Sequence, residues 1–336
     1  MTAEVLSTHT PELFQKAVLR AAELLRAGEV VALPTETVYG LAANALDENA
    51  VAKIFSIKGR PADNPIIIHV TGNEMAKRCV GHWPEMADKL SQAFWPGPLT
   101  LVLPRAKEIP DNVTAGGATV GVRWPSHPFI QAVIRECGFP LAAPSANLSN
   151  QISPTNAEHV RQQLGGKIPL IVDGAQAQVG IESTVLDLSV SPPQILRPGM
   201  IHAEALAAVC GNVTGAEWHV TRKATLRSPG LLKKHYSPKA KLLVLNWKTD
   251  EHLQSQLVTR HVSPVTSYVI AHTRIPAGEN FADVSVMPHD AEAFARALYA
   301  ELHRCDAAGA EVIIVETPPD SPEWSGVADR LRRAAA

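Results

Sequence analysis

The sequence lacks the signatures by which most nucleotide, metal and hydrolase sites are recognised. There is no GxxxxGK[ST] phosphate-binding loop and no GxGxxG dinucleotide motif. HExxH and GxSxG are absent too, which removes support for a zinc protease or a hydrolase nucleophile elbow. The four cysteines, at 79, 137, 210 and 305, form no CxxC pair, so we expect buried thiols rather than a zinc or redox motif. Any nucleotide site must therefore be built differently.

The chain also has a small net charge, few aromatic residues and no long apolar run. The net charge of −2 argues against a surface built throughout for nucleic acid, and aromatic residues are only 5% of the chain. No apolar run approaches the roughly 18 to 20 residues that span a bilayer, and no targeting signal is visible, so we expect a cytoplasmic location and no membrane contact. The 336 residues, 46% of them apolar, predict two globular domains.

Short β-branched runs alternate with helical patterns over residues 29–209, which predicts an α/β fold for the first domain, residues 1–209. We expect strands at residues 30–33, 65–70, 99–103, 119–123, 141–143, 170–172 and 184–188. We expect helices at residues 11–27, 48–57, 85–94, 128–136 and 156–164, the first of them opened near Thr10 and Pro11.

Residues 210–241 lose this periodicity and are basic. Residues 216–241 hold seven Lys or Arg against the single acid Glu217. The segment predicts an interdomain linker whose Lys233, Lys234, His235 and Tyr236 reach an anion, or alternatively a solvated connector.

The apolar runs KLLVLN, TSYVIAH and EVIIVET predict buried strands in a second, smaller parallel α/β domain, Rossmann-like, at residues 242–336. Its closing helix, residues 322–336, is expected to bury Val327 and Leu331. The same pattern predicts that Arg330, Arg332 and Arg333 face water or a partner.

Two polar motifs interrupt the first domain. The segment LPTETVYGLAANA can direct Thr35, Thr37 and Tyr39 into a crevice at the end of a strand, or it can hold a capping threonine and a core tyrosine. The segment KIFSIKGRPADNPIIIHV presents Lys58 and Arg60 before a proline-stiffened turn, either as a solvated face or as two cations that can bind a triphosphate.

Seven blocks follow one another in the order typical of the YrdC-like family: PTETVYGL, KGRPADNPIIIHV, FWPGPLTLVL, VGVRWPSHP, APSANLSNQISPT, GIESTVLDL and ILRPG. The chain resembles this family over residues 10–205. Its HYSP segment and small second domain resemble the long, two-domain threonylcarbamoyl-AMP synthase form. The resemblance implies a twisted, open α/β sheet that lines a deep positive cavity.

The resemblance also implies roles for individual residues. Those implied for L-threonine are Thr37, His69, Arg123, Ala143 through its backbone, and Ser183. Those implied for ATP are Arg60, Asn64, Thr119, Ser145, Ser153, Arg197 and Tyr236, with Asn147 as a polar neighbour and with Lys58 and Arg60 as the catalytic cations. From the residues alone, Asn64 can be a turn residue and Ser153 a helix cap.

The implied reaction joins L-threonine, bicarbonate and ATP, with Mg2+ on the phosphates and no metal site of the protein's own. It gives threonylcarbamoyl-AMP and pyrophosphate, and the adenylate is passed to the machinery that modifies adenosine beside the anticodon of tRNA, with at most weak tRNA contact. Two alternatives stay open. One is an RNA-binding or ribosome-maturation module, and the other is a carbamoyl-phosphate-dependent maker of carbamoyl adenylate.

Overall fold

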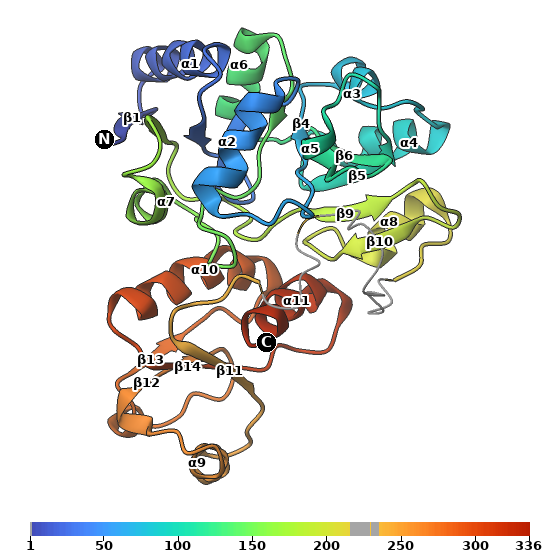
Figure 1. Cartoon of the computed structure of the whole chain (residues 1–336). Helices are drawn as coiled ribbons and strands as arrows, with labels where there is room; N and C mark the ends of the chain where they lie inside the picture. The colour runs from blue at the N-terminus through green and yellow to red at the C-terminus, as the bar shows by residue number, and fades with distance from the viewer. Residues whose placement is uncertain (1, 216–228, 230–234) are drawn as a thin grey trace. The chain divides into compact units, whose positions relative to one another are not determined.

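The computed structural model describes residues 2–215, 229 and 235–336 (Figure 1). These fall into two compact units, Met1–Ser149 with Ser153–Leu231, and Asn150–Ile152 with Leu232–Ala336. The predicted linker at residues 210–241 lies largely outside the described residues, so its predicted contact with an anion stays a prediction.

The first unit is built on a ten-stranded mixed sheet in the order β1-β8-β2-β3-β7-β4-β6-β5-β9-β10. The strands are β1 (Glu4–Ser7), β2 (Val31–Leu33), β3 (Gly40–Asn44), β4 (Ile68–His69), β5 (Leu99–Pro104), β6 (Thr119–Arg123), β7 (Leu141–Ala142), β8 (Leu170–Asp173), β9 (Thr184–Asp187) and β10 (Gln194–Arg197). The helices are α1 (Pro11–Arg26), α2 (Glu48–Lys58), α3 (Asn73–Cys79), α4 (Glu85–Phe94), α5 (Asp111–Thr114), α6 (Pro128–Cys137), α7 (Ala157–Leu164) and α8 (Ala203–Cys210).

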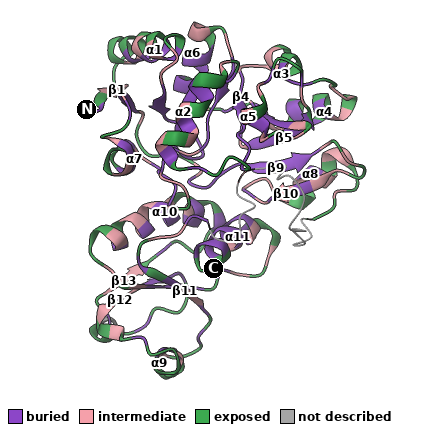
Figure 2. Cartoon of the chain, in the orientation of Figure 1, coloured by how far each residue is buried: buried purple, intermediate pink, exposed green. Residues whose placement is uncertain are grey.

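Helices cover the sheet on both faces. Along β2, Val31 and Leu33 pack into one apolar cluster with α1 and α6, while Ala32 between them packs into a second cluster that includes α2. This alternation follows from the two-residue period of a strand. Figure 2 shows the consequence, since β5 and β9 are almost wholly buried while the helices expose one side.

The predicted α/β class is confirmed, and α4 and β6 match their predicted bounds residue for residue. Thr10 caps α1 as expected, because its side chain accepts a hydrogen bond from the Leu13 N–H at 3.3 Å. Three strands of this sheet were not predicted, β1, β3 and β10. The sequence of β3, GLAAN, carries no β-branched residue and gives no strand signal.

The second unit holds a parallel four-stranded sheet in the order β11-β14-β12-β13. Its strands are β11 (Lys241–Leu245), β12 (Ser267–Ala271), β13 (Asp283–Val286) and β14 (Val312–Glu316), of which only β13 was not predicted. Its helices are α9 (Asp250–Thr259), α10 (Ala291–Ala307) and α11 (Ser325–Ala334), with short 3₁₀ turns at Pro264–Thr266, Gly278–Asn280 and Pro322–Trp324.

The closing helix corrects one prediction. Val327 and Leu331 are buried and Arg332 is exposed, as expected, but Arg330 and Arg333 are buried as well. Both pair with the buried carboxylate of Asp329, and the Arg330 guanidinium lies 5.3 Å from the centre of the Tyr236 ring. The apolar pattern could not reveal these partners.

The four cysteines are free thiols, as expected. Cys79 and Cys305 are buried, whereas Cys137 and Cys210 are only partly buried. Burial raises the pKa of the thiol of Cys79 to about 12 and that of Cys137 to about 11, so both stay protonated and unreactive at neutral pH.

Candidate active site

Strand register brings three of the predicted site residues of the first unit together. His69 ends β4 and Arg123 ends β6, and the two residues are direct partners in this parallel pair. Strand β5 runs antiparallel to β6 and parallel to β9, so the beginnings of β5 and β9 lie at the same edge. Ser183, immediately before β9, therefore joins His69 and Arg123 there, and its hydroxyl lies 2.8 Å from that of Thr100.

Arg123 is the centre of this edge and is only 4% exposed. Its Nε donates to the Gly97 carbonyl at 3.2 Å, and its Nη1 donates to the Thr37 hydroxyl at 2.9 Å. Its Nη2 lies 2.7 Å from Oε1 of Glu36, which is also buried. The guanidinium is thus held rigidly at a site shielded from water, where charge interactions are strong.

Several buried polar atoms at this edge have no good hydrogen-bond partner among the described residues. They are both carboxylate oxygens of Glu36, Nη2 of Arg123 and both ring nitrogens of His69. Each such group costs about 1–3 kcal/mol when left unpaired, so a cluster of them indicates a ligand site. Burial, reinforced by the charge of Arg123, holds the pKa of His69 well below its usual range, so the ring is neutral.

Ser183 connects the two predicted halves of the site. Arg197, assigned to ATP, donates from Nη2 to the Ser183 hydroxyl at 3.1 Å and from Nε to the Ser183 carbonyl at 3.0 Å. A shift of Ser183 would therefore move Arg197 as well. The residues predicted for the amino acid and for the nucleotide share one hydrogen-bonded network at this point.

Lys58 closes α2, where Gly59 adopts the left-handed conformation that ends the helix. The Lys58 ammonium donates to the carbonyls of Ser145 and Asn147, both at 2.5 Å. Burial, together with the nearby charge of Arg60, places the pKa of Lys58 well below its usual range. Lys58 therefore fixes the loop that carries Ser145.

Arg60 is likewise turned toward its own chain. It donates from Nε to the Asn64 carbonyl at 3.0 Å and from Nη2 to the Asn64 side-chain oxygen at 2.7 Å. Nη2 also donates to the Pro65 carbonyl at 2.6 Å. Asn64 thus lies in the turn and accepts hydrogen bonds from Arg60 through both its carbonyl and its side chain. The catalytic roles of Lys58 and Arg60 stay predictions.

The remaining predicted residues of the first unit lie on loops and, for Thr119, at the start of β6. Ser153 does not cap α7, since Asn156 does so, and it instead donates to Glu182 at 2.6 Å. Tyr39 is a core residue whose hydroxyl donates to the Ala175 carbonyl at 2.7 Å. The backbone N–H of Ala143 donates to Ile67 at 3.1 Å. Thr119 lines a narrow pocket together with Pro65, Ile66, Ile67, Val102, Val113, Thr114, Val120, Gly121, Val185 and Pro229.

Tyr236 belongs to the second unit. There its ring centre lies 6.0 Å from that of Tyr299 and 3.9 Å from that of the neighbouring His235. Its predicted contact with the nucleotide stays a prediction.

Sequence reasoning missed two buried carboxylates, Glu36 and Glu182. Each is flanked by predicted site residues, Glu36 by Thr37 and Glu182 by Ser183. An acid inside a short, apolar-flanked hydroxyl motif is the signal that could have found them, because a buried carboxylate needs a partner.

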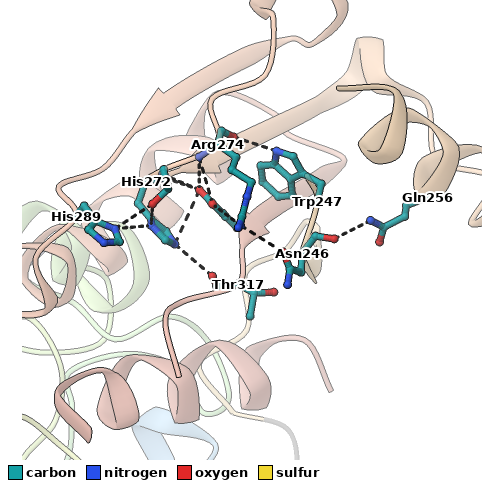
Figure 3. Close-up of polar contacts among 9 residues, drawn as sticks. Asn246, Trp247, Gln256, His272, Arg274, His289 and Thr317 are labelled. Atoms are coloured by element: carbon teal, nitrogen blue, oxygen red, sulfur yellow. Dashed lines mark hydrogen bonds and ion pairs between the residues drawn. The ribbon is translucent and has the colours of Figure 1, made fainter. Parts of the chain in front are cut away.

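The second unit has its own polar cluster, at the carboxyl ends of β11, β12 and β14 (Figure 3). The fully buried carboxylate of Glu316 accepts hydrogen bonds from the backbone N–H groups of His272, Thr273 and Arg274 at 2.8–3.2 Å. His272 lies 3.0 Å from His289 through their Nδ1 atoms, and its Nε2 lies 3.2 Å from the Thr317 carbonyl. The polar groups of this cluster therefore have hydrogen-bond partners within the cluster itself.

Among the described residues there is no set of three His, Cys, Asp or Glu side chains placed to bind a metal ion, and no helix long and apolar enough to cross a membrane. The fold and the site therefore define an α/β protein with a buried polar site, rich in arginine and hydroxyl groups, at one edge of a mixed sheet.

Comparison with known proteins is consistent with this class. Residues 23–199 match the family Sua5/YciO/YrdC, described as telomere recombination, and residues 201–336 match the threonylcarbamoyl-AMP synthase C-terminal domain. The chain belongs to the Sua5/YciO/YrdC family, in its two-domain threonylcarbamoyl-AMP synthase form.

Individual relatives cover nearly the whole chain. The threonylcarbamoyl-AMP synthase of Bacillus subtilis is 42% identical over 98% of this chain and 94% of its own length. That of Pyrococcus abyssi is 40% identical over 94% and 93%. The crystal structure of P. abyssi Sua5 complexed with L-threonine matches with a TM-score of 0.90 and 37% identity, covering 100% of this chain and 98% of that one.

Proposed function

We propose that this chain is an L-threonylcarbamoyladenylate synthase, which forms threonylcarbamoyl-AMP and pyrophosphate from L-threonine, bicarbonate and ATP. The observation that carries the proposal is the edge at which Arg123, His69 and Thr37 meet Ser183 and Arg197. That edge offers one cation, Arg123, for an amino-acid carboxylate and a second cation, Arg197, for a nucleotide. The P. abyssi relative that was crystallised with L-threonine supports the choice of amino acid.

The chemistry suits a site without a nucleophile of its own. The threonine amine is first carboxylated, and a carbamate oxygen then attacks the α-phosphorus as pyrophosphate leaves. Positioning and charge neutralisation supply most of the rate enhancement in such transfers. Arg123 would fix the amino acid, while Lys58 and Arg60 would shape and charge the loops that receive the triphosphate, with Mg2+ arriving bound to ATP as part of the substrate.

The adenylate would then serve a separate enzyme that modifies adenosine beside the tRNA anticodon. Because a carbamoyl phosphoanhydride hydrolyses in water, a covering segment is useful to this chemistry. The basic residues near 210–241, with Tyr236, are our proposal for that role.

The test is pyrophosphate release from ATP in the presence and absence of L-threonine and bicarbonate, followed by mass measurement of the product. We expect release to need both, and Lys58→Ala and Arg60→Ala each to reduce turnover at least 100-fold, as about 2.7 kcal/mol of lost transition-state stabilisation would do. Turnover with carbamoyl phosphate in place of threonine, or salt-sensitive RNA binding with no adenylate, would replace this proposal with one of its rivals.

A further inference from the structure

The threonine side of the site contains one buried acceptor to which nothing has yet been assigned. Glu36 is 3% exposed, and neither of its carboxylate oxygens accepts a hydrogen bond of good geometry within the described residues. Its ion-pair partner is Nη2 of Arg123, 2.7 Å away, and that nitrogen is itself without a good hydrogen bond among the described residues. A buried carboxylate with spare acceptor capacity is expected to meet a donor from a ligand.

The two hydroxyls predicted to bind L-threonine, those of Thr37 and Ser183, already have partners within the protein. Thr37 Oγ1 accepts from Arg123 at 2.9 Å and lies 2.9 Å from the hydroxyl of Thr35. Ser183 Oγ lies 2.8 Å from the Thr100 hydroxyl and accepts from Arg197 at 3.1 Å. Neither hydroxyl carries the charge that best complements an ammonium group.

A buried Arg and a buried Glu side by side match the two charges of an amino-acid zwitterion. The α-carboxylate and the α-ammonium are attached to one carbon, so their partners must also lie close together. Arg123 offers the positive group and Glu36 the negative group, and the two atoms that face each other are 2.7 Å apart. A substrate that inserts between them replaces one ion pair with two.

We propose that Glu36 binds the α-ammonium group of the amino acid whose carboxylate lies on Arg123, and that it accepts the proton which this ammonium loses before carboxylation. The inference rests on the proposed function. The step balances, since the ammonium, bicarbonate and the Glu36 carboxylate give N-carboxythreonine, water and the protonated Glu36. One N–H proton passes to Glu36 Oε, and the electron pair that it leaves on nitrogen forms the new N–C bond. The C–OH bond of bicarbonate breaks, and the departing hydroxide takes a second N–H proton and leaves as water.

The surroundings of Glu36 allow this change of protonation. In the free protein burial raises its pKa, but the Arg123 charge, helped by the Ser126 backbone N–H, outweighs burial and keeps the pKa below its usual range. The other titratable neighbours are His127, whose pKa burial lowers, and the neutral His69 beside Arg123. A substrate carboxylate on Arg123 shares that positive charge, and burial then shifts Glu36 toward the acid form.

The first test is binding to the full chain by calorimetry. L-threonine is compared with 2,3-dihydroxybutyrate, in which a hydroxyl replaces the amine. Glu36→Gln keeps the size of the side chain and removes its charge. We expect the variant to bind L-threonine at least tenfold more weakly and the dihydroxy acid within about twofold of wild type. If Glu36 only holds Arg123 in place, both ligands lose affinity equally, and the proposal fails.

The second test is the pH profile of kcat/KM for L-threonine. Without a proton acceptor, Glu36→Gln must use the small fraction of substrate whose amine is already neutral. Its activity should therefore rise with pH over a range in which wild type is level, and Glu36→Asp should restore part of the wild-type profile. A Glu36→Gln profile that runs parallel to wild type contradicts the proposed proton transfer.

Glu182→Gln is the matched control, because it removes another buried carboxylate of the first unit, one that accepts from Ser153 on the predicted ATP side. It should raise KM for ATP more than KM for L-threonine, and an equal rise in KM for L-threonine in both variants would overturn the inference. If Glu36→Gln does not fold, Glu36→Asp decides, with a threonine-selective loss supporting the proposal and an equal loss for both ligands refuting it. Failure of the wild-type protein to make the adenylate would refute the proposed function instead. The comparison of L-threonine and 2,3-dihydroxybutyrate binding would still test the role of Glu36 in binding the ammonium group.

Discussion

The two units differ in how they treat buried polar groups at the edge of their sheets. In the second unit, Glu316 is surrounded by three backbone donors, and His272 has partners at both ring nitrogens. In the first unit, Glu36, His69 and Nη2 of Arg123 are equally buried but lack good hydrogen bonds among the described residues. The same kind of side chain is saturated in one place and left open in the other.

This difference distinguishes groups that build structure from groups kept for a ligand. A saturated cluster orders the loops around it and gains little from binding. A cluster of buried polar groups that lack partners destabilises the ligand-free protein. Binding of a ligand that supplies the missing partners removes this unfavourable free energy. Substitutions and ligand binding should therefore affect the two clusters differently.

Arg123→Ala should break the open cluster most severely. It leaves the buried Glu36 carboxylate without its cation, and removal of one member of a buried ion pair costs about 3–5 kcal/mol. L-threonine binding should be lost as well. Urea unfolding measures the first effect and calorimetry the second. A variant that is as stable as wild type would show that the pair is not desolvated as described.

L-threonine should stabilise the first unit and not the second. A ligand at 100 times its dissociation constant adds about 2.7 kcal/mol to the stability of the state that binds it. Hydrogen exchange should therefore slow around β4, β6 and β9, with the amides that surround Glu316 unchanged. Equal protection of both sheets would contradict the contrast.

Glu316→Gln should reduce stability without affecting L-threonine binding. The neutral amide is a weaker acceptor for the backbone N–H groups of His272, Thr273 and Arg274, so the second unit should lose about 2 kcal/mol of stability. KM for L-threonine should stay as in wild type. The control is Glu301→Gln, a half-buried carboxylate of the same unit that is bonded to Arg304, for which a smaller loss is expected.

The smallest expected effect is the pH dependence from His69. Its folded pKa lies well below the ordinary 6.5, so the unfolded chain binds a proton that the folded chain refuses as pH falls through that value. Stability is therefore lost on acidification. Between about pH 7.5 and 5.5, wild type should lose about 1.4 kcal/mol more than His69→Asn, because one group titrates only in the unfolded state. Urea unfolding at the two pH values measures these losses of unfolding free energy. Equal losses in wild type and His69→Asn would show that the His69 ring is hydrated in the folded protein.

Much of the fold could be predicted from local pattern. The β-branched run of β6 and the period of α4 determined their bounds, and the Thr10 cap marked the start of α1. Strand β3 escaped because its Gly and Ala residues owe their strand conformation to pairing with β2 and β7.

The sequence predicted those residues of the site that stand in recognisable motifs. Thr37, Arg123, Ser183 and Arg197 stand in recognisable blocks, and strand register brings them together. The position of Glu36 inside a hydroxyl motif was a sign of burial, but only the fold places its partner, Arg123, beside it. Arg330 was misassigned to the surface for the same reason, since Asp329 and the Tyr236 ring become its partners only in the folded unit.

The most direct measurement is a structure of the full chain with L-threonine bound. We predict that the ligand's carboxylate lies within hydrogen-bonding distance of Arg123, and that its nitrogen lies within the same distance of Glu36. The buried atoms that are open in the free protein would then be paired. Threonine bound elsewhere, with Glu36 and Arg123 still paired only with each other, would contradict the account.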